Sequence, residues 1–144
     1  MTDTTKWTQK THNTLMAGLV AATLGAAAMA SPAAAGGSLS FSITPNNAED
    51  ARAMRTGMQV YSLFNGARNG GSIRQNGRNN EAGLGQNGHG NVGIVHQEGD
   101  GHSGTVQQNG NHNAYGLFQF GENTDGHVVQ NGNGQTGATF QFGW

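Results

Sequence analysis

The sequence predicts an all-β fold, a two-sheet β-solenoid of the cross-β type built from eleven-residue half-repeats. The first observation is that Gln recurs every eleven residues with Gly two places later, seven times in succession. The second is that each half-repeat divides into a seven-residue stretch ending at the Gln and four residues rich in Asn and Gly. A fixed period of this kind is typical of one small structural unit stacked on copies of itself.

The repeated residues occupy fixed positions in each unit. Seven residues match the length of a typical strand, and Gly and Asn turn a chain through positive φ at little cost. The glycines are therefore expected in the turns that follow the strands. The glutamines are Gln75, Gln86, Gln97, Gln108, Gln119, Gln130 and Gln141, and the glycines are Gly77, Gly88, Gly99, Gly110, Gly121, Gly132 and Gly143.

Alternation along each strand predicts which side chains face inward. One inward layer is aliphatic: Leu84, Val95, Val106, Leu117 and Val128. It is flanked by the Gln layer and by a mostly polar layer at offset five from the Gln: Asn80, Asn91, His102, Asn113, Thr124 and Gln135. Tyr115 falls at an inward position that is otherwise mostly small, where facing glycines are expected to leave room for its ring.

A weaker period of 22 residues predicts two strands per circuit, because "LFQFGE" at 117–122 is echoed by "TFQFGW" at 139–144. One sheet would contain the strands ending at residues 75, 97, 119 and 141, and the other those ending at 86, 108 and 130. Phe118 would then stack with Phe140, and Phe120 with Phe142. Stacked strands lie about 4.8 Å apart, so that identical amides fall above one another and can form ladders.

Composition agrees with stacking rather than with an ordinary globular core, since 34% of the residues are hydrophobic and 25 are Gly. Lys and Arg number 7 against 8 Asp and Glu, which gives no electrostatic case for binding nucleic acid or an anionic membrane. The absence of Cys excludes disulfides, zinc–thiolate sites and thiol nucleophiles.

Residues 1–35 are predicted to be a signal peptide for export. Lys6 and Lys10 precede an apolar run at 15–30, and small residues follow. The run is shorter than the roughly twenty residues of a membrane-spanning helix. Cleavage is expected near Ala35, although Ala30 also satisfies the small-residue rule, and no membrane insertion is expected once the signal has been removed.

Residues 36–68 lack the repeat and form a separate N-terminal segment. A short helix is predicted at about 47–64, with Asn47 as N-cap, Glu49 and Asp50 in the first turn and Gly66 as the stop. The alternative is that residues 58–64 form a strand, since "MQVYSLF" is rich in strand-forming residues. Residues 69–144 form the repeat domain.

The repeat resembles that of the curlins, the subunits of curli amyloid fibres on bacterial surfaces. The residues that carry the resemblance are "QNGNHNAYGLFQ" at 108–119 and "QNGHGNVGIVHQ" at 86–97, and it covers about residues 64–144. The resemblance implies a fibre subunit that polymerises with itself outside the cell, in a role of biofilm matrix and adhesion. By position, it implies a structural amide ladder at the seven glutamines, with Asn80, Asn91 and Asn113 as the paired amides.

The resemblance also implies partners: a nucleator subunit, an outer-membrane secretion pore and a periplasmic chaperone. Two roles within the family remain open, major subunit and nucleator, and the even run of repeats to Trp144 favours the major subunit. Departures from the motif are His102, Thr124 and Gln135 at Asn positions, and Phe64 where a first Gln would stand.

Other functions have less support in the sequence. The histidines fall at different repeat offsets, and acidic residues form no close pair, so neither a metal site, a cofactor site nor an enzyme is expected. A monomeric secreted solenoid, acting as an adhesin or ligand-binding repeat protein, is the alternative; it needs capping segments at both ends, and none is apparent. Asp100 and Asp125 are interpreted as gatekeeper charges that slow premature assembly, with a simple turn-forming role as the alternative for Asp100.

Overall fold

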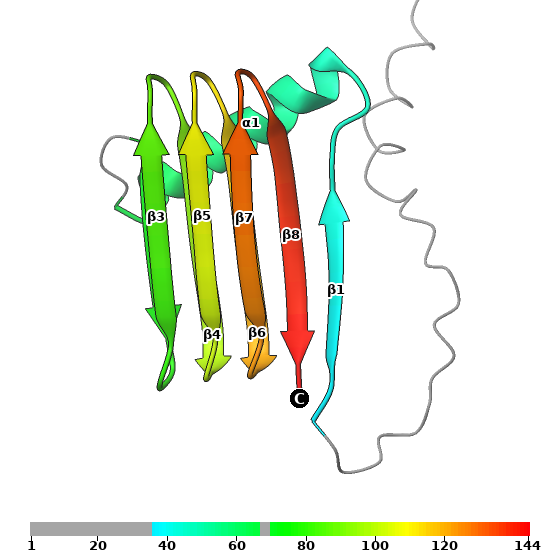
Figure 1. Ribbon diagram of the computed structural model, residues 1–144, viewed down its shortest axis with the longest axis vertical. Helices are drawn as coiled ribbons and strands as arrows, with labels where there is room; N and C mark the ends of the chain where they lie inside the picture. Colours follow the sequence, from blue (N-terminus) through cyan, green and yellow to red (C-terminus); the bar gives the residue numbers. More distant parts are fainter. Residues whose placement is uncertain (1–35, 67–69) are drawn as a thin grey trace, which may run out of the picture. The chain divides into compact units, whose positions relative to one another are not determined.

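The computed structural model describes residues 36–66 and 70–144 (Figure 1). The predicted signal peptide lies outside these residues. In chain order the elements are β1 (Ser38–Ile43), α1 (Ala48–Phe64), β2 (Gly71–Asn76), β3 (Glu81–Asn87), β4 (Val92–Asp100), β5 (Ser103–Asn109), β6 (Ala114–Glu122), β7 (Asp125–Asn131) and β8 (Thr136–Gly143). The described part of the chain contains no helix with the length and apolar character needed to cross a bilayer.

The predicted two-sheet β-solenoid is confirmed. Sheet A contains β2, β4, β6 and β8 together with β1, and sheet B contains β3, β5 and β7. Neighbouring repeat strands are parallel and in register with a step of 22 residues, so that Gln97 lies beside Gln119 and Val106 beside Val128. The chain therefore alternates between the sheets once every eleven residues, as its two periods predict.

The strands of one sheet face the gaps between strands of the other. A Cβ added to Gly104 in β5 would approach Gln97 of β4 as well as Gln119 and Leu117 of β6. The small inward positions thus receive long side chains from two strands of the opposite sheet. Val95, Val106 and Leu117 form the centre of this core and are at most 1% exposed.

The repeat glycines hold the backbone in conformations that other residues rarely adopt. Gly110 has φ of 119°, and a Cβ at that position would lie 2.0 Å from the carbonyl oxygen of Gly132. The expectation that all seven lie in turns is wrong at three places: Gly99 and Gly121 lie inside β4 and β6, and Gly143 ends β8. Gly143 is not among the glycines of positive φ, although its partner Gly121 has φ of 86°.

Helix α1 confirms the predicted helix and excludes a strand at 58–64 in this structure. Asn47 accepts a hydrogen bond from the backbone N–H of Asp50 at 2.8 Å, and the helix ends at Phe64, before Gly66 with φ of 73°. Met58 packs on a second apolar cluster, formed by residues on the outer face of sheet A: Val92, Ile94, Ala114 and Ala138. The repeat pattern alone assigned these alternating positions to the outside, where the helix now covers them.

Strand β1 was not predicted, and it corrects the expectation of uncapped ends. It pairs antiparallel with β8 from Ser38 beside Gly143 to Ile43 beside Ala138. Gly37 and Trp144 extend this pairing through two backbone hydrogen bonds of 2.8 and 2.9 Å. The edge of β8 is thereby covered, and the edge strands within the described residues are β1 and β2 in sheet A and β3 and β7 in sheet B.

Candidate functional site

The repeat glutamines form two hydrogen-bonded columns inside the solenoid, here called the amide columns. Each Nε2 donates to the Oε1 of the glutamine 22 residues later, at 2.8 to 2.9 Å. The sheet A column runs through Gln75, Gln97, Gln119 and Gln141, and the sheet B column through Gln86, Gln108 and Gln130. Gln97, Gln108 and Gln119 are 0% exposed, so that these amides are bonded entirely within the protein.

Each column also bonds the opposite sheet. The Nε2 of Gln97 donates to the carbonyl of Glu81 at 2.7 Å, and that of Gln119 donates to the carbonyl of Ser103 at 2.8 Å. The Nε2 of Gln108 reaches the carbonyl of Val92 at 3.0 Å. Both amide hydrogens of a central Gln are therefore used, one along the column and one across the core, which meets the requirement that buried polar groups be hydrogen-bonded.

The columns end with unused hydrogen-bonding groups. Neither Oε1 of Gln75 nor Oε1 of Gln86 accepts a hydrogen bond from a described residue, and at the other end Gln130 and Gln141 donate only to backbone carbonyls. The side chains at these ends are also more exposed than the central ones, Gln75 most clearly. A further strand beside β2, β3 or β7 would meet the same bonding groups that each internal strand meets, whereas β1 already occupies the edge of β8.

The inward asparagines connect rungs in a different way from the glutamines. Asn91 donates from Nδ2 to the carbonyl of Gly110 at 2.8 Å and accepts from the backbone N–H of Asn113 at 2.9 Å. Asn113 repeats this with Gly132 and Gln135, and Asn80 with Gly99 and His102. These asparagines thus hold the turn of the next rung and do not bond one another's side chains.

His102 and Thr124 stand at two of the Asn positions and bond each other. The Nδ1 of His102 lies 2.8 Å from Oγ1 of Thr124, and its Nε2 lies 3.3 Å from the carbonyl oxygen of Glu98. His102 is 1% exposed and Thr124 is 3% exposed. A His–Thr pair therefore replaces two Asn links without leaving the rung unconnected.

Tyr115 occupies its inward position because Gly137 lies beside it on the next rung. A Cβ on Gly137 would come within 2.7 Å of the Tyr115 ring, so that only Gly leaves room for it. The Tyr115 hydroxyl lies 2.8 Å from Oγ1 of Thr139, which in turn lies 2.7 Å from Oγ of Ser42. The expected room beside glycine is present, and this chain of hydroxyls reaches β1.

An aromatic stack on the outer face of sheet A combines predicted and unpredicted contacts. Phe118 stacks on Phe140 at 4.8 Å between ring centroids, and Phe120 on Phe142 at 5.3 Å, as the 22-residue period predicts. Phe41 of β1 adds a further ring, 5.3 Å from Phe140. The signal for this contact was the alternation in "SLSFSI", which places Leu39, Phe41 and Ile43 on one side of a strand.

Tyr61 of α1 joins this face next to His96. Its hydroxyl bonds the Nδ1 of His96, and its ring meets Phe118 edge-on at 5.9 Å. Burial raises the pKa of Tyr61 above its ordinary value, with Arg74 opposing the rise and Glu98 adding to it. The helix is thus attached to the sheet by an aromatic group whose charged form the surroundings disfavour.

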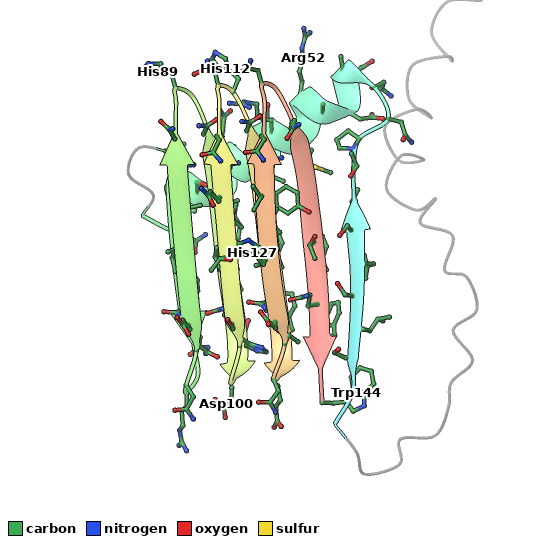
Figure 2. All side chains as sticks on the ribbon, viewed as in Figure 1. Arg52, His89, Asp100, His112, His127 and Trp144 are labelled. Atoms are coloured by element: carbon green, nitrogen blue, oxygen red, sulfur yellow. The ribbon has the colours of Figure 1, made fainter. Side chains whose placement is uncertain are left out.

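The other predicted site residues lie at the surface. Asp100 is exposed at the end of β4, where its Oδ1 accepts the backbone N–H of Arg78 at 2.7 Å. Asp125 is exposed at the start of β7. Figure 2 shows His89 and His112 at one end of the strands, His127 partway along them and Asp100 at the opposite end. Among residues 36–66 and 70–144, no group of three or more His, Asp or Glu is placed to hold a metal ion.

No family model, curated protein or solved structure matches the chain. The functional argument therefore depends on the amide columns, the free strand edges and the residues around them.

Proposed function

We propose that the chain is the structural subunit of a curli-like extracellular amyloid fibre, which polymerises with copies of itself at the cell surface and contributes to biofilm matrix and adhesion. The observation that carries the proposal is the amide columns, whose bonding repeats from rung to rung and is left incomplete at both ends. Exported subunits whose repeat strands stack end to end, with β1 displaced from β8, would complete it. A nucleator subunit, a secretion pore and a chaperone belong to this proposal as partners.

Free strand edges and weak charge support the same proposal. Within residues 36–66 and 70–144, the edge strands β1, β2, β3 and β7 each present one row of unpaired backbone groups, and such rows are templates for pairing with another chain. The formal net charge is −1, so that little electrostatic repulsion opposes the approach of a second copy. Cross-β stacking of Gln-rich and Asn-rich strands is among the most stable protein assemblies.

Strand β1 restricts how subunits can be added. While β1 is paired with β8, the β2 strand of a second copy cannot pair directly with β8. If copies stack on one another in the same orientation, β1 must therefore unpair from β8. If β1 stays paired, the copies must meet in another arrangement.

The deciding experiment follows residues 36–144 in dilute solution by amyloid-dye binding, electron microscopy and fibre diffraction. We expect fibres with reflections near 4.8 Å and about 10 Å, the spacings of strands and of packed sheets. A chain that stays monomeric for days at micromolar concentration, without dye-positive species, would contradict the proposal.

That contrary outcome would favour a monomeric secreted solenoid acting as an adhesin or ligand-binding protein. The observation in its favour is the cover formed by β1 over β8 and by α1 over the outer face of sheet A. Such covers are typical of solenoids that remain single molecules. The same experiment separates the two functions, because only the fibre subunit assembles.

A further inference from the structure

The two sheets end at different levels at the end of the solenoid that carries β8. Sheet A closes with β8 and β1, whereas sheet B closes with β7. A Cβ on Gly126 of β7 would lie 2.8 Å from Gln141 Oε1 and 3.0 Å from the Leu117 side chain, which shows that β7 faces the gap between β6 and β8. The next place in sheet B faces the gap between β8 and β1, and no described strand lies there.

This place is a groove shaped for one extended strand. One hollow is lined by the Asp125–Val129 stretch of β7 and by Ser40, Ser42, Thr139 and Gln141 from β1 and β8. A second hollow continues past Gln130 and Tyr115 toward the start of β8. One wall is the free edge of β7, with its unpaired backbone groups, and the floor is the inner face of β8 and β1.

We propose that this groove takes β1 of a second copy, and that two copies close on each other about a twofold axis parallel to the strands. β1 is antiparallel to β8, and β7 also runs opposite to β8, so that β1 and β7 run in the same direction (Figure 1). A rotation about an axis parallel to the strands keeps their direction and exchanges the places of the two sheets. β1 of the second copy then arrives beside β7 as a parallel strand.

The spacing of the strands allows the free edges of β7 and β1 to be paired in the same arrangement of two copies. Because the sheets are staggered by half a strand spacing, β1 lies one and a half spacings beyond β7 along the stacking direction. When β1 of the second copy is placed one spacing beyond β7, the β7 of that copy falls one spacing beyond the first β1. Sheet B of each copy continues into sheet A of the other, and no free edge remains at the junction. A partner that contributed a single strand, paired with β7, would leave the edge of β1 unpaired.

The twofold axis also determines the register. Ser40 lies beside Gln141, and Gln141 lies across from Gly126, so that Ser40 and Gly126 are at the same height along the strands. Three residues further in the shared direction, Ile43 and Val129 are at the same height. Rotation about an axis parallel to the strands leaves heights unchanged, and Ile43 of one copy therefore stands beside Val129 of the other.

The exposure of these residues agrees with the pairing. Ile43 and Val129 both point to the outer faces, and they are 42% and 45% exposed. Phe41, 44% exposed, would lie beside His127 on the same face. The inner face of β1 carries Ser40 and Ser42, which are small enough to pack between the strands of the second copy.

The inference goes beyond the proposed function, because a closed pair of copies needs no fibre. In the pair, β1 stays in place, and β2 and β3 remain as free edges at the two outer ends. Fibre growth through those edges would then require no unpairing of β1 from β8.

The test uses cysteine cross-linking in the full chain, which contains no native Cys. The double variant Ile43→Cys/Val129→Cys is oxidised and run on a non-reducing gel. We expect a covalent dimer with twice the mass of the 14.9 kDa chain, because neighbouring strands place Cα atoms within disulfide range. Within one chain the two side chains lie on opposite outer faces and cannot bridge.

The matched control is Leu39→Cys/Val129→Cys, in which one cysteine stands four residues, roughly 13 Å, out of register. Each single variant is a further control, since the twofold axis places its two copies on opposite faces. Cross-linking of the Ile43 pair no greater than that of the Leu39 pair would overturn the proposal. A monomeric mass for the unaltered full chain in sedimentation at micromolar concentration would overturn it as well, without depending on any variant.

The results distinguish this inference from the proposed function. Fibres that form without the Ile43–Val129 cross-link would contradict the pairing and leave the fibre proposal standing. A specific covalent dimer from a chain that forms no fibres would support the pairing and contradict the fibre proposal.

Discussion

Gln97 donates a hydrogen bond from Nε2 to Oε1 of Gln119 at 2.8 Å, and both side chains are 0% exposed. The bond joins two rungs of the solenoid along its axis, and each glutamine also reaches a carbonyl of the opposite sheet. Gln97 also accepts a hydrogen bond from Gln75, so that this one side chain connects β4 to β2 and β6 in its own sheet and to β3 in the other.

The first prediction compares neighbours on β5. Gln108→Ala removes an amide that is hydrogen-bonded to Gln86, Gln130 and the Val92 carbonyl. The groups that bonded this amide are then left without a hydrogen-bond partner in the core. We expect it to lower the free energy of unfolding by about 1–3 kcal/mol. Gln107→Ala, on the exposed outer face, is the control and is expected to change it by less than about 0.5 kcal/mol. Equal effects in urea unfolding would show that the inward assignment of Gln108 is wrong.

The second prediction concerns two glycines with opposite surroundings. Gly110→Ala would place a Cβ 2.0 Å from a backbone carbonyl oxygen at a φ of 119°, and a rigid backbone atom cannot move aside. We expect a loss of more than about 3 kcal/mol in the free energy of unfolding.

Gly57→Ala is its control, because nothing lies within 4 Å of the added Cβ in α1. We expect this variant to be more stable than the unaltered chain by about 0.5–1 kcal/mol, since Ala favours the helix. Thermal unfolding followed by circular dichroism measures both changes, and a tolerated Gly110→Ala would contradict the close approach of the turns.

The third prediction is a dependence of stability on pH. Burial raises the pKa of Tyr61 in the folded state above the ordinary value of 10.0. The unfolded chain therefore loses this proton first, and the stabilisation is complete below about pH 10 and is lost as the pH rises through the folded-state pKa. Tyr61→Phe should remove this contribution, so that the free energy of unfolding of the unaltered chain falls more steeply between pH 9 and 11. If the free energies of unfolding of the two proteins changed with pH in parallel, this role of Tyr61 would be contradicted.

The fourth prediction concerns the charges of Asp100 and Asp125. Asp100 accepts the backbone N–H of Arg78, and Asn111 and Asn133 accept the corresponding N–H groups on other rungs. Asp100→Asn therefore keeps the hydrogen bond and removes only the charge.

If fibres form, the double variant Asp100→Asn/Asp125→Asn is expected to shorten the lag before they appear, because it removes repulsion between approaching subunits. Dye-binding kinetics at low salt measure the lag. Asp50→Asn, in the first turn of α1 and outside the repeats, is the control. An unchanged lag would favour a turn-forming role for Asp100.

The sequence by itself determined the solenoid, because each rung repeats the same local contacts at a fixed spacing. The eleven-residue recurrence of Gln and Gly predicts the strands and turns, and the echo of Phe118 and Phe120 in Phe140 and Phe142 predicts the sheet to which each strand belongs. The inward layer of Val95, Val106 and Leu117 follows from alternation alone. Asn47, Glu49, Asp50 and Gly66 also mark both ends of α1 by local signals.

Only the tertiary structure decided what happens outside the repeat. Ser38–Ile43 is a short alternating segment, and nothing local specifies whether it pairs with β2, with β8 or with another chain. Its place beside β8 depends on contacts distant in the sequence, such as Phe41 with Phe140 and Ser42 with Thr139. The position of α1 over Val92, Ile94 and Ala114 likewise depends on apolar surface that exists only after the strands of sheet A have assembled. A periodic sequence predicts its own stacking, whereas the covering of its edges and faces results from nonlocal contacts that occur once and leave no period.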